Sequence, residues 1–198
     1  MNIEQVITFW FGSDINNPDV AKNQSALWWQ KSPQTDSLIR QKFAGGLKDL
    51  ALGHWDDWLE TPRGRLAAII VLDQFSRNMY RDTPQAFAQD SLALKWCLEG
   101  MRLKHDVELP FIGRVFFYLP LEHAESMEMQ TLSVQKFTDL AERAGADESQ
   151  TFMGFQDFAE RHLEVIEQFG RYPHRNRILG RESTADELAF IEQPGSGF

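Results

Sequence analysis

The chain has 198 residues, of which 42% are hydrophobic, and its 29 acidic against 20 basic side chains give a formal net charge of -9. This length and apolar content suit one ordinary domain, so we expect a single all-helical domain over residues 1–194, followed by a frayed tail at 195–198. The acidic balance argues against nucleic acid as a partner, because affinity for the phosphate backbone comes from clustered Lys and Arg.

A single cysteine, Cys97, excludes an internal disulfide framework. It fits a reducing compartment, so we expect a cytoplasmic location. No uncharged stretch approaches the ~18 residues that a membrane span needs, so we expect no membrane partner either.

Three helix starts are predicted where a hydroxyl residue precedes a proline. Ser-Pro at 32–33 and Thr-Pro at 61–62 and 83–84 combine an N-cap hydroxyl with a proline whose missing N–H costs nothing in the first turn. Apolar residues follow at spacings of three and four, as in amphipathic helices. Gly100 is the expected end of the helix that starts near 84.

The second half of the chain has the same helical character. Pro120 removes a backbone hydrogen bond, so a helix is expected to kink or end there. Residues 148–169 carry the longest apolar stripe, and Thr184 with Glu187 forms the capping-box pattern of a short final helix. Alternating apolar and polar residues are nearly absent, so the predicted fold class is all-α, with about seven to nine antiparallel helices joined by short loops.

A basic segment at 169–181 reads FGRYPHRNRILGR, with four arginines and no acid. Crowded guanidinium groups repel one another unless they are countercharged, which indicates either an anionic ligand or internal carboxylates nearby. In the internal interpretation, these arginines hold helices together through Asp73 and Glu125. In the ligand interpretation, they converge with Arg77 and Arg81 on a phosphate or carboxylate.

Asp73, Arg77 and Arg81 are spaced four residues apart, which would place them on one face of a continuous helix. They could form a solvated ladder, whose pairs contribute only about 0.3–0.5 kcal/mol each. Asp73, however, lies among apolar residues at the predicted core boundary, where an acid needs a partner.

His162 occupies the apolar stripe of 148–169, so its imidazole is expected to point inward. It is either a neutral core side chain bonded to a carbonyl or carboxylate, or a proton-transfer group in a cleft. His123 and Glu125 follow the interruption at Pro120, where a helix end leaves backbone groups unpaired.

Other recurrent site patterns are missing from the sequence. There is no HExxH, no CxxC pair, no P-loop, no GxSxG and no pair of Glu-x-x-His sequences, so no cofactor and no metal are expected. Metal binding by His123, Glu125, His162 or Asp73 is an open alternative. The aromatic residues 9–11, 28–29, 55 and 58 are interpreted as packing groups, because no basic groove that would suit base stacking adjoins them.

Four segments resemble the bacterial domain-of-unknown-function 924 family: TFWFG at 8–12, LDQFSRNMYR at 72–81, LPLEHAE at 119–125 and FGRYPHRNRILGRESTADELAFI at 169–191. The resemblance spans nearly the whole chain. It implies an all-helical fold similar to tetratricopeptide-repeat proteins, an irregular helical superhelix, and it brings no established activity. The residues that match the family pattern are Asp73, Gln74, Phe75, Arg77, Asn78, Arg81, His123, Glu125, His162, Arg171, Pro173, His174, Arg175, Asn176, Gly180, Arg181, Thr184 and Glu187. Ala124 stands where Ser is usual, which removes support for a catalytic hydroxyl there.

Three functions compete on this basis. The first is a helical protein whose polar cleft binds an anionic small molecule or an acidic peptide end, through Arg77, Asn78, Arg81, Arg171, His174, Arg175, Asn176 and Arg181. The second is an enzyme that uses His162 or His123 with Asp73 or Glu125 for acid–base chemistry on an anionic substrate. The third is an interaction scaffold in which the arginines only hold helices together. The oligomeric state is not predicted.

Overall fold

The computed structural model describes residues 1–193 and 195, apart from the side chain of Asp56. It contains eleven α-helical segments in this part of the chain and no strand, which confirms the all-α class. They are α1 (Ile3–Phe11), α2 (Val20–Trp29), α3 (Pro33–Ala51), α4 (Pro62–Ile70), α5 (Ser76–Met79), α6 (Asp90–Arg102), α7 (Phe111–Glu122), α8 (Met127–Arg143), α9 (Ser149–Phe169), α10 (Asn176–Leu179) and α11 (Ala185–Ile191).

Two of these segments are short, which explains why the number exceeds the expected seven to nine. α5 continues α4 through one π-helical turn at Val71–Phe75, and α10 is a single turn. Among the described residues, no helix combines the length and apolar character needed to cross a membrane. The expected tail at 195–198 lies outside the described residues, except for position 195.

Two of the three predicted helix starts are confirmed. The hydroxyl groups of Ser32 and Thr61 each accept a hydrogen bond from the backbone N–H three residues later, at 3.2 and 3.1 Å. The prediction at 83–84 was wrong, because Pro84–Phe87 forms only a 3₁₀ turn and α6 begins later. Thr83 Oγ1 donates instead to the carbonyl of Tyr80 at 2.7 Å, so the hydroxyl caps the preceding turn.

Gly100 was expected to end a helix, but it lies inside α6. A Cβ atom built at this position would lie 2.4 Å from Arg65 Cδ and 2.5 Å from Phe117 Cζ. The glycine therefore permits close packing of α6 against α4 and α7.

Two helix boundaries near the predicted site, the end of α7 and the start of α11, can be compared with the sequence predictions. α7 continues two residues past Pro120, to Glu122, so the proline lies in the last turn. At the start of α11, the capping box is confirmed: Thr184 Oγ1 accepts from the Glu187 backbone N–H at 3.2 Å, and the Glu187 carboxylate accepts from the Thr184 backbone N–H at 2.7 Å.

The main core is built around aromatic side chains from α1, the π-helical turn and α7. Trp10, Phe75 and Phe116 are fully buried, and the Trp10 ring centroid lies 5.5 Å from each of the two phenylalanine centroids. Trp29 departs from the expected buried packing, because it is 51% exposed while it stacks on Phe116 at 6.0 Å.

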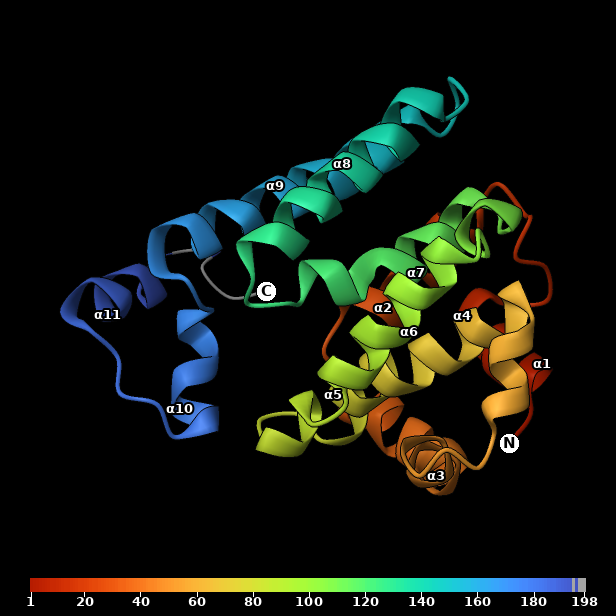
Figure 1. The fold of residues 1–198 in the computed structure, drawn as a ribbon, viewed down its shortest axis with the longest axis horizontal. Helices are drawn as coiled ribbons and strands as arrows, with labels where there is room; N and C mark the ends of the chain where they lie inside the picture. Colours follow the sequence, from red (N-terminus) through yellow and green to blue (C-terminus); the bar gives the residue numbers. More distant parts are fainter. Residues whose placement is uncertain (194, 196–198) are drawn as a thin grey trace.

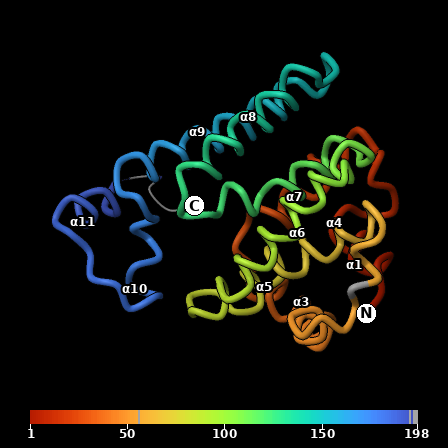
Figure 2. The backbone as a smooth tube through the Cα atoms, in the orientation of Figure 1, coloured from red at the N-terminus to blue at the C-terminus, as the bar shows by residue number. Residues whose placement is uncertain are grey.

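The C-terminal part of the molecule extends away from this core. α8 and α9 lie side by side as an antiparallel pair, and α10 and α11 form the end of the molecule remote from the N-terminal helices (Figures 1 and 2). A second, small cluster of Val165, Ile166 and Tyr172, with Phe169 and Phe190 against it, anchors this end. The anchor fixes the basic segment beside the end of α7.

Candidate functional site

Asp73 is at the centre of a buried polar cluster. Its side chain has no exposed surface and lies in the π-helical turn Val71–Phe75, a kind of distortion that often occurs at functional sites. One oxygen, Oδ1, lies 2.8 Å from Arg77 Nη1 and 2.7 Å from His123 Nδ1, and Gln74 Nε2 donates to Oδ2 at 2.6 Å. Burial alone would raise the pKa of Asp73, but the charge of Arg77 and the hydrogen bonds from His123 and Gln74 outweigh it and lower this pKa, so the carboxylate is ionised.

A chain of charged groups leads from Asp73 toward the surface. Both terminal nitrogens of Arg77 donate hydrogen bonds to the Asp90 carboxylate, at 2.9 and 3.0 Å. Asp90 Oδ2 also lies 3.6 Å from Arg175 Nη1, which is too long for a hydrogen bond. Exposure rises along this chain, because the side chains of Asp73, Arg77 and Asp90 are 0%, 19% and 23% exposed.

Arg175 is the least satisfied charged group of the cluster. Its side chain is 8% exposed, yet its guanidinium donates no hydrogen bond to any described residue, and Nε is fully buried without a partner. The guanidinium carbon lies 4.5 Å from the Tyr172 ring centroid and 4.8 Å from that of Phe87. Burial and then the charge of Arg77 lower the pKa of Arg175 to about 10, so the group is still a cation at neutral pH.

His123 forms a pair with Asp73 that fixes its tautomer. Because a carboxylate oxygen only accepts, Nδ1 carries the proton in the 2.7 Å contact and Nε2 keeps its lone pair. Burial and then the charge of Arg77 lower the pKa of His123, so the imidazole is neutral. The side chain is 15% exposed.

His162 points inward, but its main partner is a backbone carbonyl. Nδ1 lies 2.7 Å from the Phe158 oxygen and 3.5 Å from Glu122 Oε1. Burial lowers the pKa of His162 to about 3, whereas burial and then the charge of Asp73 raise the pKa of Glu122 to about 8. At neutral pH this contact therefore joins a neutral imidazole to a predominantly protonated carboxyl group and is not an ion pair.

Glu125 ties the basic segment to the end of α7. Arg181 donates to both of its oxygens, at 2.6 and 2.9 Å, and the Tyr172 backbone N–H donates at 2.8 Å. Arg181 Nε also donates to Asn176 Oδ1 at 2.9 Å. These contacts correspond to the internal interpretation of the segment, as far as Glu125 and Arg181 are concerned. His174 lies next to them, with its ring 5.6 Å from that of Tyr172.

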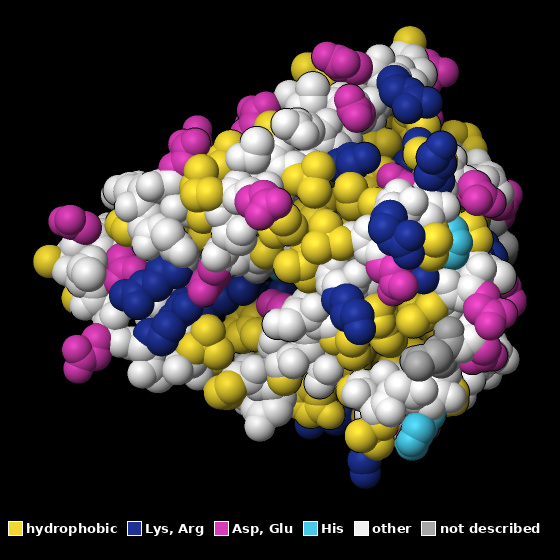
Figure 3. All heavy atoms as spheres, viewed as in Figure 1, with side chains coloured by type: hydrophobic (Ala, Val, Ile, Leu, Met, Phe, Trp, Pro, Cys, Tyr) yellow, Lys and Arg dark blue, Asp and Glu magenta, His cyan; other side chains and the backbone are white. Residues whose placement is uncertain are grey.

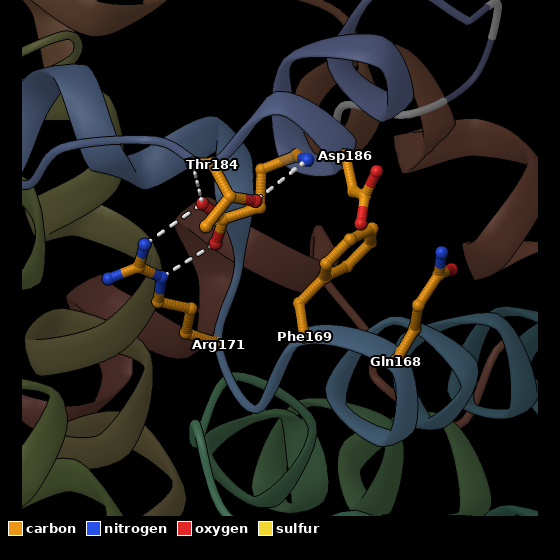
Figure 4. A pocket seen from close by; sticks show the side chains of 6 residues that line it. Gln168, Phe169, Arg171, Thr184 and Asp186 are labelled. Carbon is orange, nitrogen blue, oxygen red and sulfur yellow. Dashed lines mark hydrogen bonds and ion pairs between the residues drawn. The ribbon is translucent and has the colours of Figure 1, made fainter.

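Arg171 lies elsewhere, beside a cavity of about 430 Å³ between the end of α9 and the start of α11. Figure 4 shows Gln168 and Phe169 on one side, Thr184 and Asp186 across from them, and Arg171 turned toward a carboxylate. That carboxylate is Glu187, which accepts from Arg171 at 2.6 and 2.9 Å.

Asn78 and Arg81 also lie apart from Arg175. α5 ends at Met79, so the expected continuous helix face does not reach Arg81. Both side chains donate to Asp36, Arg81 at 2.7 and 2.8 Å and Asn78 at 2.9 Å. They line a separate cavity of about 290 Å³.

Two acids of these networks, Asp36 and Asp90, were not predicted from the sequence. Asp36 and Asp90 stand in the first turns of α3 and α6, where acidic residues are common for reasons of helix polarity. An acid in the first turn of a helix therefore does not indicate that it pairs with an arginine distant in the sequence. Among residues 1–193 and 195, no group of three or more His, Cys, Asp or Glu side chains is arranged to hold a metal ion.

The α10–α11 end of the molecule carries basic side chains on its surface, in an otherwise acidic protein. Figure 3 shows Lys and Arg side chains in a band that crosses the α10–α11 end of the molecule toward its centre. Arg171 and Arg181, with side chains 31% and 24% exposed, belong to this end.

Comparisons with known proteins place the chain in a family. A comparison with curated protein sequences finds no match. A solved structure described as "Structure of Protein of Unknown Function ATU0120 from Agrobacterium tumefaciens" is 32% identical, with a TM-score of 0.81 over 96% of each chain. Residues 6–195 match the family profile described as "Bacterial protein of unknown function (DUF924)". The chain therefore belongs to this bacterial family, DUF924.

Proposed function

We propose that the protein binds the carboxylate or phosphate group of a small molecule, or the acidic end of a peptide, at Arg175. The observation that supports the proposal most directly is that the N–H donors of this side chain lack acceptors in the described part of the chain. A guanidinium has five N–H donors, and Arg175 places none of them on an acceptor among the described residues. Leaving the buried Nε–H unpaired is costly, so an anion that accepts hydrogen bonds from this guanidinium would be stabilised.

The other candidate arginines have less capacity for a ligand. Arg77, Arg81, Arg171 and Arg181 each hold a carboxylate through two nitrogen–oxygen contacts of 3.0 Å or less. We assign these four to holding the structure together, as the scaffold interpretation expects. Arg175 is held differently, between the rings of Phe87 and Tyr172. Stacking orients a guanidinium while it leaves the N–H edge available.

The charge balance supports a site of modest affinity. Asp73 and Asp90 match Arg77 and Arg175 in number, so the cluster has no excess positive charge. Attraction of a ligand then depends on hydrogen-bond donors that are already oriented, more than on long-range electrostatics.

Thermal unfolding in the presence of acetate, inorganic phosphate and a short peptide ending in Asp tests this proposal. At constant ionic strength, at least one of these probes should raise the Tm of the wild type, because a ligand that binds only the folded state stabilises it. Arg175→Gln should abolish that increase. Arg177→Gln is the matched control, because Arg177 is exposed in the same segment and its substitution removes an equal charge.

Two outcomes would contradict anion binding at Arg175. One is the absence of stabilisation by all three probes. The other is an equal increase in Tm for the wild type and the folded Arg175→Gln protein, which would move the binding elsewhere.

Acid–base catalysis is the second candidate, and the 2.7 Å contact between Asp73 and His123 favours it. A carboxylate that orients an imidazole leaves Nε2 as a base. His162 is less suited, because its Nδ1 bonds to a carbonyl and its pKa is about 3. A panel of carboxylate-bearing esters provides the test: turnover should be lost in His123→Asn while anion binding is retained, and unchanged turnover in that variant would exclude His123.

A further inference from the structure

Asp90 lies between Arg77 and Arg175, the two arginines of the buried polar cluster. Its oxygens accept hydrogen bonds from Arg77 at 2.9 and 3.0 Å, and Oδ2 lies 3.6 Å from Arg175 Nη1. Both guanidinium groups also lie over the ring of Phe87, with their central carbons 5.7 and 4.8 Å from its centroid. Two cations held against one ring repel each other, so the Asp90 carboxylate supplies the countercharge that this pair requires.

Asp90 compensates the charge of Arg175 but does not satisfy its donors. A separation of 3.6 Å is too long for a hydrogen bond, and Arg175 Nε is buried without a partner among the described residues. Burial and the charge of Arg77 lower the pKa of Arg175, and among the carboxylates Asp90 opposes them most strongly. A negative charge therefore stands beside Arg175 while its N–H groups are left for another acceptor.

An anion that binds Arg175 meets the charge of Asp90. An oxygen that accepts from Nη1 lies about 3 Å from this nitrogen, which brings it within roughly 7 Å of Asp90 Oδ2. Asp90 cannot turn away without the loss of its two hydrogen bonds from Arg77. The incoming anion is therefore repelled by a negative charge that is fixed in place.

We infer that Asp90 is an internal competitor of the ligand, which holds the countercharge position at Arg175 and thereby limits the affinity of the site. This inference rests on the proposed anion site and adds the residue that sets its strength. Removal of the Asp90 charge should raise the affinity for a monovalent anion between about threefold and fiftyfold, the limits for a separation of roughly 7 Å in water and near a protein surface.

Asp90→Asn tests this effect with little change in shape, because the amide oxygen can still accept a hydrogen bond from Arg77. In equilibrium titrations of the full chain at constant ionic strength, acetate and sulfate should both bind the variant more tightly than the wild type. The increase for sulfate, a dianion, should be about the square of the increase for acetate, because Coulomb energy is proportional to the ligand charge. A purely structural role of Asp90 would not produce this charge dependence.

Asp157→Asn is the matched control, because Asp157 is exposed on α9 and its substitution removes an equal charge. It should leave both affinities unchanged. Equal or weaker binding to Asp90→Asn, or an equal increase for the two anions, contradicts the internal competitor and leaves the anion site intact. No binding of any anion to either protein contradicts both.

If Asp90→Asn does not fold, the ¹³Cγ resonance of Asp90 in the wild type decides. It should shift with a saturable dependence on added sulfate, because the anion binds beside this carboxylate. The resonance of Asp36, whose carboxylate is held by Arg81, is the internal control and should stay in place. An Asp90 resonance that does not respond while that of Arg175 does overturns the inference.

Discussion

The charged side chains near Asp73 differ in burial, and burial decides how much each of them contributes to the stability of the fold. Asp73 is an ionised carboxylate with no exposed surface, so its contacts with Arg77, His123 and Gln74 replace its hydration. Removal of one member of such a network leaves the others buried without a partner, which costs more than the pair itself contributes.

Asp73→Asn should therefore lower the free energy of unfolding by about 3–5 kcal/mol. The exposed pair of Glu4 and Arg63, whose side chains are 64% and 43% exposed, serves as the control. Arg63→Gln should cost less than about 1 kcal/mol. Urea denaturation of both variants makes the comparison, and a loss for Asp73→Asn as small as that for Arg63→Gln would show that Asp73 is not the centre of a buried network.

Glu122 gives a prediction of the opposite kind, because the fold favours its protonated form. Its pKa is raised to about 8 in the folded state, so the folded protein binds more protons than the unfolded chain between about pH 4.5 and 8. Stability that depends on this proton is complete below the unfolded pKa and is lost as the pH rises through that window.

Glu122→Gln removes this dependence while it conserves volume. Relative to the wild type, the variant should gain stability as the pH rises from 5 to 8, by about 1.4 kcal/mol per pH unit where the slope is steepest. Urea unfolding at several pH values measures the difference, in which the contribution of His162 largely cancels because that residue is present in both proteins. A difference that does not vary with pH would mean that Glu122 is ionised in the fold.

Part of this residue-scale arrangement could be predicted from the sequence. The position of Asp73 among apolar residues predicted that it needs a partner, and the position of His162 in the stripe predicted that it is buried; the structure has both. The role of Asp90 could not be predicted, since its contacts with Arg77 and Arg175 depend on how three separate segments pack. Whether any of these residues binds a ligand is still a prediction.

At the scale of elements, the predictions that succeeded were those with a local physical cause. The hydroxyl caps of α3 and α4 and the capping box of α11 follow from hydrogen bonds within four residues. The end of α6 and the π-helical turn at Val71–Phe75 have no such local cause. Gly100 shows why: its role depends on the Arg65 and Phe117 side chains from other helices.

A pair of glycine substitutions tests this interpretation of Gly100. Gly100→Ala should lower the free energy of unfolding by about 1–3 kcal/mol, because the added methyl group meets Arg65 and Phe117. Gly154→Ala, in α9 with open space around it, should raise it by about 0.5–1 kcal/mol through helix propensity. Equal effects of the two changes in urea denaturation would exclude close packing as the role of Gly100.

At the scale of the whole molecule, the fold places the segment after α9 against the end of α7. The second apolar cluster provides one anchor, and the contact of Arg181 with Glu125 provides another. The anchors hold Arg175 beside Asp90, so the candidate site exists only when the C-terminal segment is docked.

Arg181→Gln should therefore loosen residues 171–191 more than the rest of the chain. The ion pair is partly exposed, with side chains 24% and 25% exposed, so global stability should fall by no more than about 1 kcal/mol. Hydrogen exchange should nevertheless become faster in this segment, with Arg177→Gln as the control. Uniform acceleration across the chain, or none at all, would show that Arg181 does not anchor the segment.

The central claim is that Arg175 is a buried cation that binds an anion through N–H donors without acceptors in the described part of the protein. The NMR resonance of its own N–H group tests this claim most directly. In ¹H–¹⁵N spectra of the wild type, the Arg175 Nε–H signal should shift with a saturable dependence on added acetate or inorganic phosphate, as a charge-assisted hydrogen bond forms at the guanidinium. The Arg181 Nε–H, already bonded to Asn176, should stay in place. An Arg175 signal that does not respond to acetate, inorganic phosphate or a peptide ending in Asp, or that shifts without saturation in parallel with that of Arg181, would contradict the claim.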